Sequence, residues 1–305
     1  MSLSVGIVGL PNVGKSTLFN ALAARRLAET APRPFTTIQP HEAVVPVPDE
    51  NLQKLAALIK PEKLVPATVT FIDIAGLIKG AAQGEGLGNQ FLAKIREVNA
   101  IVQVVRFFED PNVPHVHARL DPKEDIEVIN LELELGGIRE KPTIYVANLQ
   151  ENQLEWAAEL LAPVETLVSP APVIAICAKI EEELTDLAPE ERPAYLHQWG
   201  IEQSGLEKLI IAAYQVLNLI TFYTIKGGKE VHAWSVRKGT TAREAAGEVH
   251  TDFAQKFIKA EVINVTELLE IGAWQRSKEL GKIRLEGRDY VVQDQDVIEF
   301  KIGAR

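Results

Sequence analysis

The chain has 305 residues, of which 46% are hydrophobic and 24% charged, ordinary values for a globular protein. No apolar run approaches the ~20 residues that cross a bilayer, and the start runs into a strand pattern without a basic leader. The single cysteine, Cys177, excludes an internal disulfide and suits a reducing compartment. We therefore expect a cytoplasmic protein with no membrane segment. Two domains are expected, since one core seldom grows beyond about 250–300 residues.

The net charge of −10 is unevenly distributed along the chain. Residues 1–220 hold 18 basic and 29 acidic side chains, whereas residues 221–305 hold 14 and 13. An acidic first part has to bind anions through local donors and not through a general positive field. The composition also lacks the basic excess of most nucleic-acid-binding proteins. We expect no DNA binding, and any RNA contact to be a localised patch.

A phosphate-binding motif follows the first strand pattern, which covers residues 3–8. Residues 9–17, Gly-Leu-Pro-Asn-Val-Gly-Lys-Ser-Thr, match G-x-x-x-x-G-K-[ST], and an amphipathic helical pattern follows at 17–24. This arrangement directs backbone amides and a helix dipole at an anion. We expect Lys15 to reach the β- and γ-phosphate oxygens during catalysis and Ser16 to ligate Mg²⁺. The remaining nucleotide-binding residues expected in this loop are Asn12, Val13, Gly14 and Thr17.

Strand and helix patterns alternate from here to residue 217, which predicts an α/β, doubly wound sheet of the P-loop NTPase, G-protein-like type. Strands are expected at 43–48, 67–72, 100–107, 142–147 and 172–176. Helices are expected at 52–59, 89–98, 125–135, 189–199 and 206–217. Prolines in the first of these strands indicate an edge position.

Two loops carry the features of a γ-phosphate sensor. Thr37, with Thr36 as the alternative, lies in the proline-containing segment after the first helix, where nucleotide switches place a Mg²⁺ ligand. Asp73 and Gly76 follow the strand at 67–72 as Asp-x-x-Gly. We expect Asp73 to hold Mg²⁺ through water and the Gly76 amide to bond the γ-phosphate. The next residue is Leu77, which lacks the polar group that usually orients the attacking water.

Base recognition is expected in the loops after the strands at 142–147 and 172–176. GTPases usually carry Asn-Lys-x-Asp in the first loop, where the aspartate accepts two hydrogen bonds from guanine. This chain has Asn148-Leu149-Gln150-Glu151, so the lysine is missing and the carboxylate is one methylene longer. Because a displaced charge-assisted pair costs about 2–4 kcal/mol, we expect ATP to be preferred over GTP. The second loop contributes Cys177, Ala178 and Lys179.

From Thr221 the pattern changes to short strands around one helix. Strands are expected at 222–225, 231–236, 262–265, 282–285 and 297–301, and a helix at 242–249. This predicts a small β-grasp-like α+β domain. The expected domains are therefore 1–220, which binds nucleotide, and 221–305, an interaction module.

Several of these motifs resemble those of the YchF/Obg-like ATPase family. The resemblance covers nearly the whole chain and rests on residues 9–17, 71–77, 84–92, 125–130, 145–148, 237–241 and 285–294. It implies an ATPase with a C-terminal TGS domain that associates with the ribosome. Many GTPases carry a glutamine at the position of Leu77. The resemblance also implies that a loop histidine replaces this glutamine, and His115 matches the position of that histidine whereas His117 does not. We expect a monomer.

One stretch departs from the family. Its members usually carry a long helical insertion between the helix at 125–135 and the strand at 142–147. Residues 131–143 leave no room for two helices of ~12 residues and a turn. The insertion is therefore absent here, which puts contacts made by that arm in doubt.

Alternatives remain open at this point. The chain could be a GTPase that tolerates Glu151, or a nucleotide-binding module with negligible turnover because of Leu77. Asn12 either stabilises its own loop or helps to hold K⁺ beside the phosphates.

Overall fold

The computed structural model describes residues 3–29, 41–74, 87–116 and 119–303. Two compact units are present, one formed by residues 1–46 and 69–217 and the other by residues 47–68 and 218–305. Among the described residues, no helix is both long and apolar enough to span a bilayer. The expected sites at Thr36, Thr37, Gly76, Leu77 and His117 lie outside the described residues.

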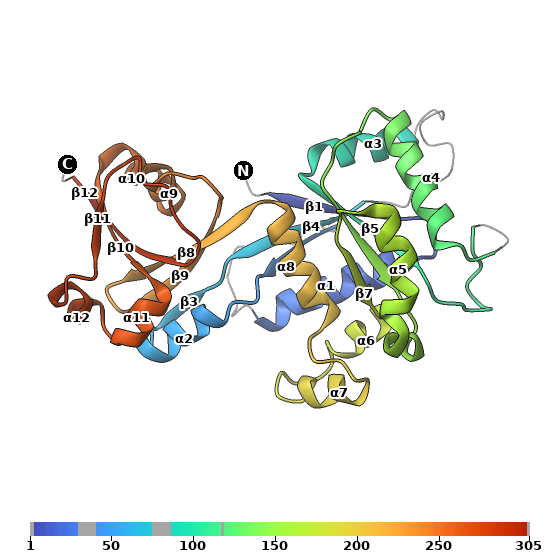
Figure 1. The fold of residues 1–305 in the computed structure, drawn as a ribbon, viewed down its shortest axis with the longest axis horizontal. Helices are drawn as coiled ribbons and strands as arrows, with labels where there is room; N and C mark the ends of the chain where they lie inside the picture. The colour runs from blue at the N-terminus through green and yellow to red at the C-terminus, as the bar shows by residue number, and fades with distance from the viewer. Residues whose placement is uncertain (1–2, 30–40, 75–86, 117–118, 304–305) are drawn as a thin grey trace. The chain divides into compact units, whose positions relative to one another are not determined.

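The first unit contains a six-stranded sheet in the order β2-β4-β1-β5-β6-β7 (Figure 1). Its strands are β1 (Ser4–Val8), β2 (Glu42–Pro46), β4 (Thr68–Asp73), β5 (Ala100–Arg106), β6 (Thr143–Asn148) and β7 (Val173–Ile176). β1 pairs in parallel with β4 and β5, and the parallel pairing continues through β6 to β7. All seven residues of β5 are buried, as expected for a strand covered on both faces. The α/β expectation is confirmed.

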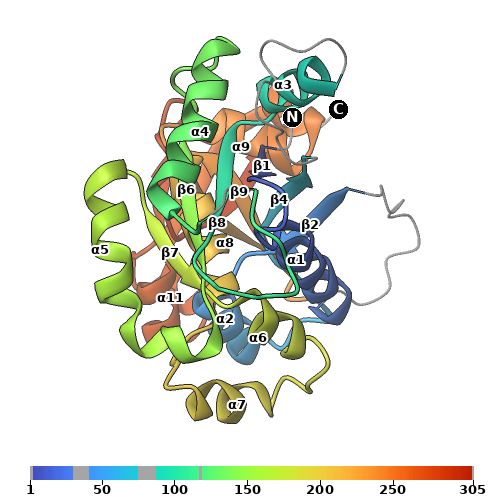
Figure 2. The ribbon, with the colours of Figure 1, turned by 90° about the vertical axis from the view of Figure 1, so that its right-hand side faces the viewer.

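Helices cover both faces of this sheet, with α4 and α5 on one side and α1 on the other (Figure 2). The helices are α1 (Lys15–Glu29), α3 (Leu87–Glu97), α4 (Pro122–Leu135), α5 (Ala157–Val168), α6 (Ala178–Glu183), α7 (Arg192–Gln198) and α8 (Gly205–Val216), with the 3-10 turn η1 (Glu151–Trp156). The sequence patterns did not predict α5, α6 or η1. α4 begins three residues earlier than expected because Asp121 caps it and Pro122 opens its first turn.

The second unit is built on another six-stranded sheet, in the order β11-β10-β12-β8-β9-β3. Its strands are β3 (Lys63–Val65), β8 (Leu219–Lys226), β9 (Glu230–Arg237), β10 (Phe257–Asn264), β11 (Arg284–Glu286) and β12 (Asp296–Ile302). Its helices are α2 (Glu50–Ile59), α9 (Ala242–Val249), α10 (Thr251–Lys256), α11 (Val265–Ile271) and α12 (Trp274–Glu279). β8 and β9 form an antiparallel hairpin, whereas β12 pairs with β8 in parallel, which gives the mixed sheet expected of a β-grasp. Val265 was expected in a strand; it begins α11, because Asn264 caps that helix.

Residues 47–68 differ from the expected domain boundaries. They were assigned to the first domain, but they pack with residues 218–305. Leu52 and Leu55 of α2 are fully buried in a core shared with Tyr223. The Tyr223 hydroxyl donates to Asp49, which also caps α2, and β3 extends the second sheet by pairing in parallel with β9. The nucleotide-binding unit is therefore discontinuous in sequence.

Candidate nucleotide-binding site

The phosphate loop joins the end of β1 to the start of α1, at the carboxyl edge of the parallel sheet. Gly14 has a φ of +95°, and a Cβ there would lie 2.2 Å from Asn148 Nδ2. A Cβ on Gly9 would lie 2.6 Å from the Val104 carbonyl oxygen. Neighbouring groups thus approach both motif glycines too closely for a side chain. Gly14 is also required because of its positive φ. The loop is held in a shape that a non-glycine sequence would not adopt.

Lys15 opens α1 and lies folded over the loop. Its Nζ donates to the carbonyl oxygens of Gly9 at 3.0 Å and Leu10 at 2.7 Å. Burial lowers the pKa of Lys15 to about 8, and the nearby Asp73 carboxylate partly opposes this shift. The ammonium is therefore a desolvated cation at the phosphate loop, where a phosphate oxygen would be a stronger acceptor than a carbonyl.

The two described metal candidates come from neighbouring elements. Ser16 is exposed in the first turn of α1, and Asp73 ends β4, where it lies beside Ile7 of β1. A hydroxyl and a carboxylate are the oxygen ligands that Mg²⁺ accepts, with water and phosphate completing its shell. No group of three His, Cys, Asp or Glu residues gathers within the described part of the chain. The donor set fits a Mg²⁺ ion brought in with a nucleotide and not a pre-formed protein cage.

Asn148 joins the phosphate loop to both base loops. It is 5% exposed at the end of β6. Its Nδ2 donates to the Val13 carbonyl oxygen at 2.9 Å, and its Oδ1 accepts from the Ala178 amide at 3.1 Å. Both ends of the side-chain amide are therefore used within the protein. Asn148 sets the spacing between the phosphate end and the base end of the site.

Glu151 and Lys179 face each other across the two base loops. The Lys179 Nζ lies 2.6 Å from Glu151 Oε1, and this hydrogen bond holds the pKa of Glu151 below its usual range. The sequence analysis placed both residues at the site but did not predict the ion pair. The Glu151 carboxylate is thus engaged by a lysine and not presented alone to a base.

The other candidate residues of the base loops have buried side chains. The Leu149 side chain is 2% exposed and belongs to the core beneath α5. Cys177 is 4% exposed, and burial raises the pKa of its thiol. Ala178 is also buried, at 4% exposure, whereas Lys179 is exposed.

His115 lies against the start of α4. Its Nε2 is 3.0 Å from Asp125 Oδ2, and both side chains are largely buried, at 9% and 3% exposure. The preceding residue, Pro114, accepts a hydrogen bond from Asn12 Nδ2 at 3.1 Å. The histidine loop is therefore tied directly to the phosphate loop. For Asn12, the structure shows this tether between loops.

Arg106 is a residue that the sequence analysis missed. It ends β5, is 3% exposed, and lies over the Phe108 ring at 4.3 Å. Its Nη1 donates to the Asn12 carbonyl oxygen at 3.5 Å and its Nε to the Phe108 carbonyl oxygen at 2.9 Å. The one signal in the sequence was a charged residue at the end of a largely apolar strand. It supports the histidine loop and the phosphate loop together.

Comparisons with known proteins agree with this geometry. A model described as a 50S ribosome-binding GTPase matches residues 4–149, and the YchF-GTPase C-terminal model, described as a protein of unknown function, matches residues 219–303. The chain is 42% identical to "Ribosome-binding ATPase YchF" of Bacillus subtilis, with 99% of each chain covered. It is 40% identical to the protein of the same name from Escherichia coli O157:H7, covering 98% of this chain and 99% of that one.

The Bacillus subtilis alignment spans 365 positions, so at least 60 of them have no residue in this 305-residue chain. In the structure, α4 and β6 are joined directly by residues 136–142. The "Structure of the Schizosaccharomyces pombe YchF GTPase" superposes with a TM-score of 0.86 at 32% identity, covering 98% of both chains. The chain belongs to the YchF family.

Proposed function

We propose that the chain is a Mg²⁺-dependent ATPase that binds the ribosome and changes state with its nucleotide. The observation that carries the ATP assignment is the Glu151–Lys179 pair at the base end of the site. Guanine recognition in this fold needs a carboxylate that accepts from two guanine N–H groups. Here the carboxylate is longer and already accepts from a lysine. Adenine presents no such pair of donors, so its binding does not depend on a free carboxylate.

Relatives support the same activity. The Bacillus subtilis and Escherichia coli proteins are named ribosome-binding ATPases. The similarity extends over both units, so it includes the nucleotide site and the C-terminal unit. Association with the ribosome implies that the chain acts in the cytoplasm.

Lys15 would bind the β- and γ-phosphate oxygens, and Ser16 and Asp73 would hold Mg²⁺. Bound there, the ion would neutralise charge that develops on the phosphate oxygens. The Gly14 backbone and the amides at the start of α1 orient the phosphate chain. Thr37 and Gly76 remain our candidates for sensing the γ-phosphate.

His115 takes the part that a glutamine has in other members of this fold class. When Nε2–H donates to Asp125, a neutral imidazole carries its lone pair on Nδ1, where it can accept a proton from water. Asp125 fixes the ring tautomer and its orientation, as the carboxylate does in other His–Asp pairs. The Asn12–Pro114 hydrogen bond keeps this loop beside the phosphate loop.

The test is a single-turnover measurement with Mg-ATP on the full chain and on His115→Ala, with His197→Ala as the control. His197 is exposed on α7 and is not one of the candidate site residues. We expect His115→Ala to slow hydrolysis by about a hundredfold or more while ATP affinity changes little. A wild-type rate no faster than background would show a nucleotide-binding module and not an enzyme.

A GTPase is the second candidate. It is favoured by the family model for a 50S ribosome-binding GTPase and by the Schizosaccharomyces pombe relative, which is named a YchF GTPase. Competition between ATP and GTP for the site decides between the two. Tight GTP binding with weak ATP binding would replace our assignment.

Potassium is a further proposal for this site. Asn12 has a φ of 62° and lies in the phosphate loop, where its side-chain oxygen could help to hold a monovalent cation. Equal hydrolysis rates in K⁺ and Na⁺ would remove this proposal and leave Asn12 as a tether to Pro114.

A further inference from the structure

Several large hydrophobic side chains are exposed on α4, η1 and α5, and we call the exposed side of these elements the α4–α5 surface. Seven large hydrophobic side chains are exposed among the described residues of the first unit, and five of them lie on α4, η1 and α5. They are Leu131 (55% exposed), Leu135 (56%), Trp156 (56%), Leu160 (37%) and Leu167 (42%). Figure 2 shows α4 and α5 on the same side of the sheet. A cluster of this kind marks an interaction surface more often than chance exposure does.

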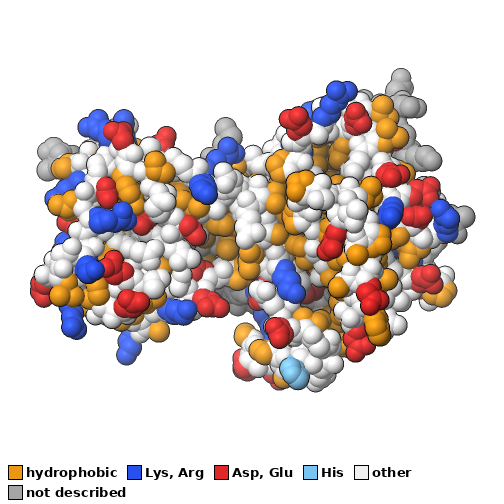
Figure 3. Space-filling view, viewed as in Figure 1, with side chains coloured by type: hydrophobic (Ala, Val, Ile, Leu, Met, Phe, Trp, Pro, Cys, Tyr) orange, Lys and Arg blue, Asp and Glu red, His pale blue; other side chains and the backbone are white. Residues whose placement is uncertain are grey.

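The charge around these side chains is mostly negative. The exposed carboxylates of the three elements are Glu124, Glu127, Glu134, Glu155, Glu159 and Glu165. Lys123 is the one basic residue within α4, η1 and α5, and residues 142–178 contain no lysine or arginine. Arg139, in the connection after α4, lies 3.9 Å from Glu134. In Figure 3, orange and red side chains occur together, with a few blue ones among them, where α4 and α5 lie in Figure 1.

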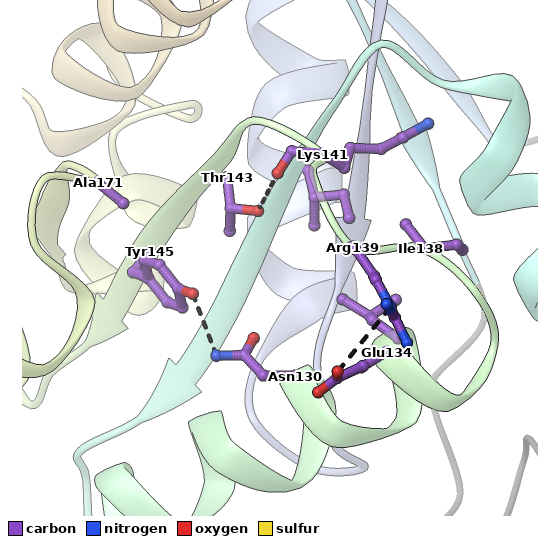
Figure 4. A pocket seen from close by; sticks show the side chains of 10 residues that line it. Asn130, Glu134, Ile138, Arg139, Lys141, Thr143, Tyr145 and Ala171 are labelled. Atoms are coloured by element: carbon purple, nitrogen blue, oxygen red, sulfur yellow. Dashed lines mark hydrogen bonds and ion pairs between the residues drawn. The ribbon is translucent and has the colours of Figure 1, made fainter.

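A groove lies along the C-terminal half of α4, and Arg139 and Lys141 are among the residues that line it. It is a pocket of about 490 Å³ whose floor is formed by Ile101, Thr143 and Tyr145. Figure 4 shows Asn130 and Glu134 of α4 on one side and Ala171, beyond α5, on the other. Asn130 Nδ2 donates to the Tyr145 hydroxyl at 3.4 Å. The groove thus combines apolar and hydroxyl-bearing side chains with charged groups of both signs.

The exposed apolar side chains of α5 lie along one side of the helix. Leu160 and Leu167 are seven residues apart, which places them on one flank of the helix, and Trp156 precedes Leu160 by one turn. Leu161 and Val164 point instead into the core. The surface therefore combines an apolar stripe on α5 with an acidic, partly apolar α4.

We propose that the α4–α5 surface binds a basic amphipathic helix of a protein on the ribosome, an inference that rests on the proposed ribosome association. The apolar face of such a helix covers the exposed leucines and Trp156, and its lysines and arginines pair with the surrounding glutamates. Ribosomal RNA fits poorly, because six exposed carboxylates repel its phosphates. A second copy of this chain would bring the same acidic groups together.

The experiment compares co-sedimentation of three forms of the full chain with purified ribosomes from Bacillus subtilis, the source of the 42% identical relative. They are the unsubstituted chain, Glu127→Lys/Glu159→Lys on the surface, and Glu190→Lys/Glu202→Lys as the control. All four glutamates are exposed. Each double variant replaces two of them with lysine, so both variants change the net charge equally. ATP hydrolysis without ribosomes is measured for each form and should be unchanged, which shows that the nucleotide site is intact.

The sign of the effect identifies the partner. If the partner is a basic protein helix, the surface variant binds ribosomes at least about tenfold more weakly than the unsubstituted chain, and the control variant binds them as tightly as that chain does. Tighter binding of the surface variant would indicate an RNA contact and overturn the proposal. Equal binding of all three forms would also overturn it while leaving ribosome association in place. If the unsubstituted chain does not sediment, ribosome association fails, and this inference fails with it.

Discussion

The phosphate end of the site is shaped by backbone, whereas the base end is held together by side chains from two neighbouring loops. At the phosphate end, Gly9 and Gly14 let neighbouring groups approach within distances that no Cβ permits. At the base end, the Glu151–Lys179 pair joins residues 28 positions apart, both at least partly exposed. Substitutions at the phosphate end should therefore weaken nucleotide binding strongly, and those at the base end should mainly change selectivity.

Gly14→Ala tests the phosphate end and should have the largest effect. The new Cβ would lie 2.2 Å from Asn148 Nδ2, at a φ of +95° that an L-residue rarely adopts. Backbone strain of about 1–3 kcal/mol plus the displaced Asn148 predicts ATP binding weaker by about a hundredfold, measured by calorimetry. Gly137→Ala is the matched control, since it has a φ of +74° but nothing within 4 Å. Normal ATP binding by Gly14→Ala would show that the loop adapts.

Asn148→Ala tests the connection between the two ends. It leaves the Val13 carbonyl and the Ala178 amide without their partner in a buried place. Each such group costs roughly 1–3 kcal/mol, so we expect lower stability in urea unfolding together with weaker nucleotide binding. Asn112→Ala, at an exposed position, should change neither. Unaltered stability of Asn148→Ala would mean that water replaces the amide and that the two ends are not coupled by it.

The pH dependence of ATP binding tests the electrostatics of the phosphate end. Lys15 has a pKa of about 8 because it is buried, and bound phosphates would favour its protonated form and raise that pKa. ATP affinity should therefore be flat below about pH 8 and fall by up to tenfold per pH unit above it, until the pKa of the complex is reached. Lys15→Arg keeps a cation at every pH in this range and should remove the step. A step that persists in Lys15→Arg would come from another group.

The same contrast explains what could be predicted from the sequence. The phosphate loop is local, because strand, glycines and helix follow one another within a few residues, so the motif predicted this part of the structure. The Glu151–Lys179 and Asn12–Pro114 contacts depend on which loops meet at the carboxyl edge of the sheet. The sequence analysis placed these residues in loops but did not predict their partners.

Residues 47–68 show the same limit for the fold. Local signals correctly indicated α2, which Asp49 caps in the structure. Nothing local could show that Leu52 and Leu55 would be buried with Tyr223 in the second unit, or that β3 would pair with β9. An element belongs to the unit whose core it packs into. The core that buries α2 is formed by residues more than 150 positions later in the sequence.

Lys179→Met tests the base end and should have the smallest effect. It frees the Glu151 carboxylate, which then becomes available to the N–H groups of guanine, while the methionine keeps much of the length of the lysine side chain. Because exposed ion pairs are weak, we expect the ratio of ATP to GTP affinity to fall by no more than about fivefold, mainly through tighter GTP binding. Glu151→Gln is the matched variant: it also breaks the pair but offers guanine no carboxylate, so it should not tighten GTP binding. If both variants shift the ratio equally, selectivity comes from the loop backbone around Ala178 and not from the charge of Glu151.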